Sequence, residues 1–125
     1  MLANSAVRPT IPVTNIEKAK KFYVGTLGLK LLPANMQGMA LLSAGKGTLI
    51  ELYERGQTKA DHTVATFEVG NIESVVKNLK EKGITFEEYD MPGIKTKNGI
   101  ATQGSVRAAW FKDTDQNILC IHESR

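Results

Sequence analysis

One short stretch of this chain occurs twice. Residues 13–21 read VTNIEKAKK and residues 69–77 read VGNIESVVK, and five identical residues recur at a constant spacing of 56 positions. In each copy an Asn that can cap a helix, Asn15 or Asn71, follows the end of a predicted strand and precedes a helical pattern. A spacing near half of the 125 residues indicates a duplicated unit, so we expect two similar modules. Paired modules often enclose a cleft, and clefts bind ligands.

The composition excludes several classes of protein. With 42% hydrophobic and 23% charged residues, the chain is expected to be globular rather than disordered. No apolar run approaches the roughly 20 residues of a membrane-spanning helix, and the N-terminus does not resemble a signal peptide. Its lysines alternate with glutamates and form no dense basic stripe, so we expect neither membrane nor nucleic acid as a partner. A single cysteine fits a reducing cytoplasm, where we expect the protein.

The pattern of apolar residues, Gly and Pro predicts the same order of elements twice, β-α-β-β-β. Module one spans about 6–54, with strands at 6–13, 29–33, 38–43 and 47–54 and a helix at 16–27. Module two spans about 62–123, with strands at 62–69, 84–89, 101–111 and 117–123 and a helix at 72–82. Residues 90–100 are expected to form a long irregular segment, either a lid or a plain surface connection.

Alternation along the strands locates a candidate site. One face is apolar in four of the predicted strands and should carry the helices, whereas the other face mixes apolar residues with single ionisable groups. Such a mixture suits a ligand-holding face, although a half-buried antiparallel sheet also turns a polar face to water. The candidate ligand-binding residues are Arg8, Glu51, Tyr53, His62, Val64, Trp110, Cys120 and His122.

Three motifs, in this order along the chain, resemble those of one known superfamily. They are VTNIEKAKKFYVGTLGLKLL at 13–32, the repeat at 69–83, and WFKDTDQNIL at 110–119. The chain resembles the vicinal oxygen chelate superfamily, the glyoxalase I, bleomycin-resistance and extradiol-dioxygenase group. The third motif departs from the usual D-P-D-G-N, because Thr114 and Gln116 replace its Pro and Gly. The resemblance implies an α+β fold, a single domain over 1–125 whose paired modules form a curled, cup-like mixed sheet, and a homodimer.

In the metal enzymes of this superfamily four side chains hold a divalent ion. The resemblance implies that these positions fall at Arg8, Glu51, Val64 and Cys120. A guanidinium offers only donors and a valine offers no ligand atom, so we expect no metal and no other cofactor. The alternative is a displaced site made of Glu51, His62 and His122, since a shift of two residues keeps a side chain on the same face but moves it about 6.6 Å.

Arg8 and Glu51 are expected to form an ion pair in place of the lost metal site, at a hydrogen-bond distance of roughly 2.7–2.9 Å. This pair could be purely structural, or Arg8 could grip an anionic or carbonyl-bearing ligand. Cys120 has no clear base partner other than His122, and we interpret it as a small buried thiol.

Two functions follow from these residues. The first is a metal-free protein that binds a small molecule, as the drug-sequestering members of the superfamily do. The second is a lyase, isomerase or dioxygenase that uses a displaced metal, or Glu51 as a catalytic base polarised by Arg8. A third hypothesis is an interaction module with a vestigial pocket. The sequence leaves open whether the protein is an enzyme, and it does not identify the ligand.

Overall fold

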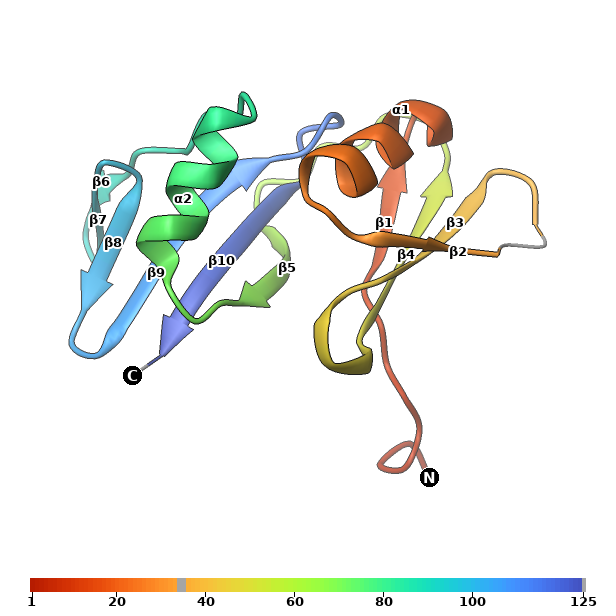
Figure 1. Cartoon of the computed structure of the whole chain (residues 1–125), viewed down its shortest axis with the longest axis horizontal. Coiled ribbons are helices and arrows are strands. Elements are labelled where there is room, and N and C mark those ends of the chain that lie inside the picture. Colours follow the sequence, from red (N-terminus) through yellow and green to blue (C-terminus); the bar gives the residue numbers. More distant parts are fainter. Residues whose placement is uncertain (34–35, 125) are drawn as a thin grey trace. The chain divides into compact units, whose positions relative to one another are not determined.

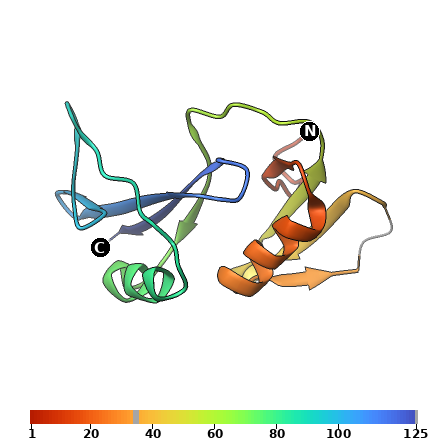
Figure 2. The same ribbon diagram turned by 90° about the horizontal axis from the view of Figure 1, so that it is seen from above.

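The structure is a computed structural model that describes residues 1–33 and 36–124. The chain divides into two compact units, Met1–Thr58 and Lys59–Arg125 (Figure 1). In each unit a helix lies over one face of a mixed β-sheet, which Figure 2 shows from a second direction. The predicted α+β fold with two β-α-β-β-β-type modules is therefore confirmed. No helix in the described part of the chain has the length and apolar character needed to cross a membrane.

The first unit contains a four-stranded sheet in the order β1-β4-β3-β2. Strands β1 and β4 are parallel, and the other pairs are antiparallel. The elements of this unit are β1 (Thr10–Val13), α1 (Ile16–Lys20), the π-helix η1 (Lys21–Thr26), β2 (Lys30–Leu32), β3 (Met39–Ser43), the short 3₁₀ turn η2 (Gly45–Gly47) and β4 (Leu49–Glu54).

The second unit repeats this plan with two additional strands. Its sheet has the order β5-β10-β9-β8-β7-β6, with β5 parallel to β10 and the rest antiparallel. Its elements are β5 (Thr63–Glu68), α2 (Ile72–Glu81), β6 (Asp90–Met91), β7 (Ile94–Lys97), β8 (Ile100–Gln103), β9 (Val106–Lys112) and β10 (Ile118–Ser124).

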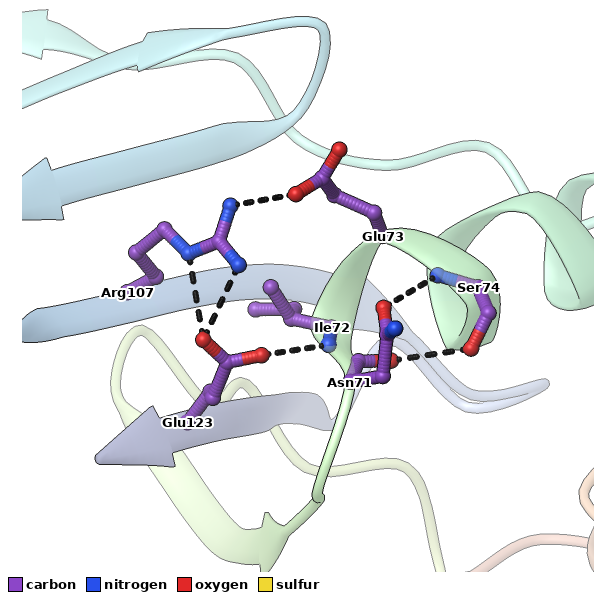
Figure 3. Close-up of polar contacts among 6 residues, drawn as sticks. All are labelled: Asn71, Ile72, Glu73, Ser74, Arg107 and Glu123. Atoms are coloured by element: carbon purple, nitrogen blue, oxygen red, sulfur yellow. Dashed lines mark hydrogen bonds and ion pairs between the residues drawn. The ribbon is translucent and has the colours of Figure 1, made fainter. Parts of the chain in front are cut away.

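Both helices begin at the predicted Asn residues. The side chain of Asn15 accepts a hydrogen bond from the backbone N–H of Lys18 at 3.0 Å. Asn71 accepts one from the N–H of Ser74 at 3.1 Å (Figure 3). Each bond satisfies an N–H that has no partner within its own helix, and this explains why an Asn stands at the same place in both copies of the repeat.

The predicted apolar face forms the core of each unit. In the first unit the largest fully buried side chains on the sheet are Ile11, Leu42 and Leu52, and in the second they are Phe111 and Leu119. Apart from the buried Cys120, the residues that alternate with them along the strands are partly or fully exposed, as expected when a helix covers only one face of the sheet. The opposite face of each sheet is therefore open for a site.

Two predicted elements in the first unit have different bounds in the structure. The first strand begins at Thr10 rather than near residue 6, so Arg8 precedes it. The predicted helix 16–27 continues as far as expected but widens after Lys20, where the N–H of Leu27 bonds to the carbonyl of Phe22 at 3.0 Å. This five-residue spacing is that of a π-helix, which periodicity alone does not distinguish from an α-helix.

The prediction for residues 84–111 was wrong in detail. Residues 84–89 form no strand, and only a single bridge joins Phe86 to Phe111. The segment 90–100 is not irregular, because it contains β6 and β7 and begins β8. Asn98 and Gly99 make the turn between β7 and β8, with φ values of 55° and 83°. The predicted strand 101–111 is in fact two strands, β8 and β9.

The carboxylate of Glu88 links the β7–β8 hairpin to residues 84–89, which precede β6. Glu88 Oε1 accepts hydrogen bonds from the Thr96 hydroxyl at 2.6 Å and from the Gly99 N–H at 3.0 Å. These two bonds lower the pKa of Glu88 below its ordinary value of 4.5. The stability that Glu88 contributes is therefore complete above pH 4.5 and is lost as the pH falls through the lowered pKa.

We predict that acidification lowers the melting temperature of the wild-type protein more than that of Glu88→Gln, which cannot ionise. The difference should develop as the pH falls below 4.5 and through the lowered pKa of Glu88. Melting curves across this range test the prediction, and Glu81→Gln on the exposed side of α2 is the matched control. Parallel pH profiles for the wild type and Glu88→Gln would contradict it.

Candidate functional site

The open face of the first sheet carries partly exposed residues from three strands. Thr10 of β1 and Glu51 and Tyr53 of β4 lie on this face, beside Met39 and Leu41 of β3. A cavity of about 270 Å³ opens here, just below the usual range for small-molecule sites, which begins at about 300 Å³. Its walls are Arg8, Pro33, Met36, Met39, Ala40, Leu41 and Glu51. The site thus combines one cation and one carboxylate with apolar walls.

Arg8 and Glu51 lie together, as predicted, but less closely. Arg8 Nη2 is 3.6 Å from Glu51 Oε2, longer than the predicted hydrogen bond of 2.7–2.9 Å. The side chain of Arg8 is 44% exposed and that of Glu51 is 19% exposed. Glu51 also accepts a hydrogen bond from the Thr10 hydroxyl at 3.3 Å. Because Arg8 precedes the strand, the pair is partly solvated rather than buried. The role of Glu51 as a catalytic base stays a prediction.

The open face of the second sheet gathers other predicted residues. Cys120 and His122 of β10 alternate with buried residues, and they pair with Thr66 and Glu68 of β5. His122 Nδ1 contacts the carboxylate of Glu68. We did not nominate Glu68 from the sequence, because the partner of a given residue depends on the register between two strands far apart in the chain. Val64 lies two residues before Thr66 and hence on the same face.

Aromatic residues line this second face. Trp110 of β9 pairs with Cys120 of β10, and Tyr89 packs edge-on against Trp110 with ring centroids 5.5 Å apart. Burial is the main cause that raises the pKa of Tyr89, and the nearby Glu87 and Cys120 raise it further. The hydroxyl of Tyr89 therefore stays protonated at neutral pH. Tyr89 was not nominated from the sequence, which predicted a regular strand at 84–89 where the structure has none. The two rings give this face an apolar surface suitable for a flat organic molecule.

Cys120 is buried, as predicted. Burial raises the pKa of its thiol, and the hydrogen bond with Thr66 only partly offsets that effect. The thiol is therefore protonated at neutral pH, unlike that of a typical cysteine nucleophile.

His62 and His122 lie at opposite ends of the β5–β10 pair. His62 directly precedes Thr63, which pairs with Ile118, whereas His122 pairs with Glu68. Several strand residues of roughly 3.3 Å each separate the two imidazoles. The side chain of His62 is 72% exposed, and its Nδ1 lies 3.5 Å from the carboxylate of Asp61. The second sheet therefore does not bring the two histidines together for a shared metal ion.

The four positions that the resemblance assigns to metal ligands do not fit a divalent ion. Arg8 carries only donors, Val64 has no polar side-chain atom, and the thiol of Cys120 is protonated. Within each unit, no three His, Cys, Asp or Glu side chains gather as a metal site requires among residues 1–33 and 36–124. Glu51 alone has the oxygen donors that a hard cation prefers.

The third sequence motif builds a turn rather than a site. The buried carboxylate of Asp113 accepts hydrogen bonds from the N–H groups of Asp115 and Asn117 through Oδ1, at 2.8 and 2.9 Å. Its Oδ2 accepts one from the side-chain amide of Asn117 at 2.8 Å. Gln116 takes a φ of 67°, at the place where the resembled motif has glycine. The motif therefore forms the turn that joins β9 to β10, and its polar residues stabilise that turn.

Comparisons with known proteins agree with this fold. The family model of the Glyoxalase/Bleomycin resistance protein/Dioxygenase superfamily matches residues 5–121. A member of that superfamily from Sphaerobacter thermophilus is 26% identical over 99% of this chain and 100% of its own, with a TM-score of 0.74. TnmS3, an antibiotic binding protein from Streptomyces sp. CB03234, is 21% identical over the whole of both chains, with a TM-score of 0.72.

A glyoxalase family protein from Enterococcus faecalis is 24% identical over 98% of this chain and 100% of its own, with a TM-score of 0.72. No curated protein matches the chain. The family match covers nearly the whole sequence, including both copies of the repeat and the Asp113 turn. The chain belongs to the glyoxalase/bleomycin resistance protein/dioxygenase superfamily.

Proposed function

We propose that this protein binds a small organic molecule without the help of a divalent metal, and that Arg8 provides the main polar contact. The proposal rests on the hydrogen-bonding capacity that the Arg8 guanidinium retains. Within the described part of the chain its guanidinium makes no hydrogen bond, and Glu51 is near enough to orient it but too far to occupy its N–H donors. A half-exposed guanidinium beside apolar walls suits a ligand with a carboxylate or carbonyl group and an apolar body.

Two further observations support a binding role. A structure with the same fold is an antibiotic binding protein. In addition, the open face of the second sheet offers Trp110 and Tyr89 for contact with an apolar group. We also propose that the chain acts as one domain and that it forms a homodimer in the cytoplasm. A single monomer-mass species in light scattering at micromolar concentration would contradict the dimer.

We predict that Arg8→Gln weakens ligand binding by about tenfold or more, since a hydrogen bond to a charged group contributes about 1.5–3 kcal/mol. The free energy of unfolding should change by less than about 1 kcal/mol, because the ion pair is solvated. Mass spectrometry of denatured protein identifies any molecule that co-purifies, and benzoate serves as a probe in NMR titrations. Arg55→Gln, which removes another exposed arginine of the first unit, is the control. Equal affinities for the wild type and Arg8→Gln would refute the proposal.

The absence of a metal can be tested separately. Purified protein should contain much less than one equivalent of Zn, Ni, Fe or Mn, because the four expected ligand positions lack a suitable set of donors. EDTA should leave the melting temperature unchanged. Elemental analysis measures the metal content directly. A stoichiometric metal that is lost in His62→Ala or His122→Ala would favour the metal-dependent lyase, isomerase or dioxygenase instead.

A further inference from the structure

The last strand of each unit supplies a carboxylate to the start of the helix. In the first unit Glu54 Oε2 accepts a hydrogen bond from the N–H of Ile16 at 2.9 Å. In the second unit Glu123 Oε1 accepts one from the N–H of Ile72 at 2.8 Å. Ile16 and Ile72 are corresponding residues of the sequence repeat. The two glutamates are therefore structurally equivalent, and each unit can serve as a comparison for the other.

In the second unit this carboxylate also holds a guanidinium. Arg107 Nε and Nη2 donate to Glu123 Oε2 at 3.2 and 2.9 Å. Arg107 Nη1 donates to Glu73 Oε1, on the first turn of α2, at 2.7 Å (Figure 3). Arg107 lies directly opposite Glu123 in the β9–β10 ladder. Two carboxylates, one from the last strand and one from the helix, thus hold one planar cation between them.

The first unit has the same two carboxylates but no arginine between them. The residue opposite Glu54 is Gly38, whose carbonyl accepts a hydrogen bond from the N–H of Glu54 at 2.8 Å. Glu17 corresponds to Glu73 in the repeat and contacts only the neighbouring Lys20, at 3.0 Å, in the part of the chain that the structure describes. Among the same residues, the carboxylate of Glu54 has the N–H of Ile16 as its sole hydrogen-bond partner.

A groove occupies the place that corresponds to the Arg107 side chain. It has a volume of about 490 Å³ and includes Glu17, Gly38 and Glu54. Lys20, which is paired with Glu17, also lines the groove, so the two carboxylates face one cation of the chain itself. The remaining walls are Ile16, Gln37 and the apolar residues Leu31, Leu32, Pro33, Met36 and Met39. Leu31 is 48% exposed and Met36 is 65% exposed. The groove therefore combines carboxylates at one end with exposed apolar surface.

We propose that this groove, which shares Pro33, Met36 and Met39 with the cavity at Arg8 but includes neither Arg8 nor Glu51, binds an organic cation with a guanidinium or primary ammonium group on a short apolar chain. The charged group lies between Glu54 and Glu17, where Arg107 lies in the second unit, and the apolar chain covers Leu31 and Met36. The acidic residues alone would not indicate a ligand. The equivalent pair in the second unit, however, holds a guanidinium in this geometry.

NMR titration of the full chain with n-butylguanidinium, and with the uncharged n-butylurea of similar shape, tests the proposal. Butylguanidinium should shift the amide signals of Ile16, Gly38 and Glu54 and reach saturation, with a dissociation constant on the order of 1 mM. Butylurea should bind at least about tenfold more weakly, because it cannot form charge-assisted hydrogen bonds. This comparison uses only the wild-type protein, so it does not depend on whether a variant folds.

Glu54→Gln should weaken the binding of butylguanidinium by about tenfold and leave benzoate binding near Arg8 unchanged. Glu81→Gln, which makes the same change of charge on the second unit, should leave both affinities unchanged. Equal binding of the urea and the guanidinium, or equal affinity in Glu54→Gln and the wild type, would overturn the proposal. Shifts that grow linearly to about 100 mM without saturation would overturn it as well.

Discussion

Replacement of Gly99 by alanine should lower the free energy of unfolding by about 3 kcal/mol. Two effects add at this position. The φ of Gly99 is +83°, a conformation that costs a residue with a side chain about 1–2 kcal/mol. A Cβ atom here would lie 2.9 Å from the Cβ of Phe86, which is buried against Phe111, and crowding of this kind costs about 1–3 kcal/mol. Urea unfolding followed by circular dichroism measures the loss.

Gly104→Ala is the matched control for this experiment. Gly104 also has a positive φ, +61°, but a Cβ atom there meets nothing within 4 Å. The control should therefore cost only the backbone strain, about 1 kcal/mol. The difference between the two variants isolates the contact with Phe86. Equal losses for Gly99→Ala and Gly104→Ala would mean that Phe86 moves aside freely and that the packing beneath the β7–β8 turn is loose.

We expect a loss of similar size, about 3 kcal/mol, for Glu123→Ala. The change removes the hydrogen bond to the start of α2, which contributes about 0.5–2 kcal/mol, and the charge-assisted bonds with Arg107, which contribute about 1.5–3 kcal/mol. The Glu123 side chain is only 5% exposed, so water cannot easily replace these bonds. The free energy of unfolding from urea denaturation measures the effect.

The duplicated unit again provides the control. Glu54→Ala removes the equivalent hydrogen bond to the start of α1, but Glu54 is exposed and has no arginine opposite it. Its loss should be about 1 kcal/mol, typical of an exposed helix cap. Glu123→Gln should lie between the two alanine variants, because glutamine can still accept a bond from Ile72. Equal losses for Glu54→Ala and Glu123→Ala would show that the bonds between Glu123 and Arg107 contribute nothing to the free energy of unfolding.

The local signals of the sequence predicted the repeating part of the fold well. Asn15 and Asn71 cap helices as expected, because a cap depends only on residues within one turn. The Asn98–Gly99 pair was also a usable signal, since this dipeptide favours the tight turn of a hairpin. We interpreted it as part of an irregular loop, and for that reason β7 was missed and β8 was merged with β9 into one predicted strand.

The candidate site was predictable only in part. Alternation along the strands placed Arg8 and Glu51 on the mixed face, and the family resemblance predicted that they pair, but neither could show that Arg8 precedes the strand and is half exposed. The pairing of Glu68 with His122 depends on the register between the parallel strands β5 and β10. No short segment of the sequence specifies that register. The grouping of Tyr89 with Trp110 depends on a segment without regular structure. These contacts arise from tertiary packing, which residue patterns do not specify.

In each unit the first N–H of the helix bonds to a glutamate of the last strand, and this affects the order in which the two units fold during translation. The start of α1 is completed as soon as Glu54 has left the ribosome, while most of the second unit is still untranslated. The start of α2, in contrast, waits for Glu123, the second-to-last residue of β10. Nascent chains should therefore acquire protection from proteases in two steps, the first unit once Glu54 has emerged and the second unit only once Glu123 has emerged.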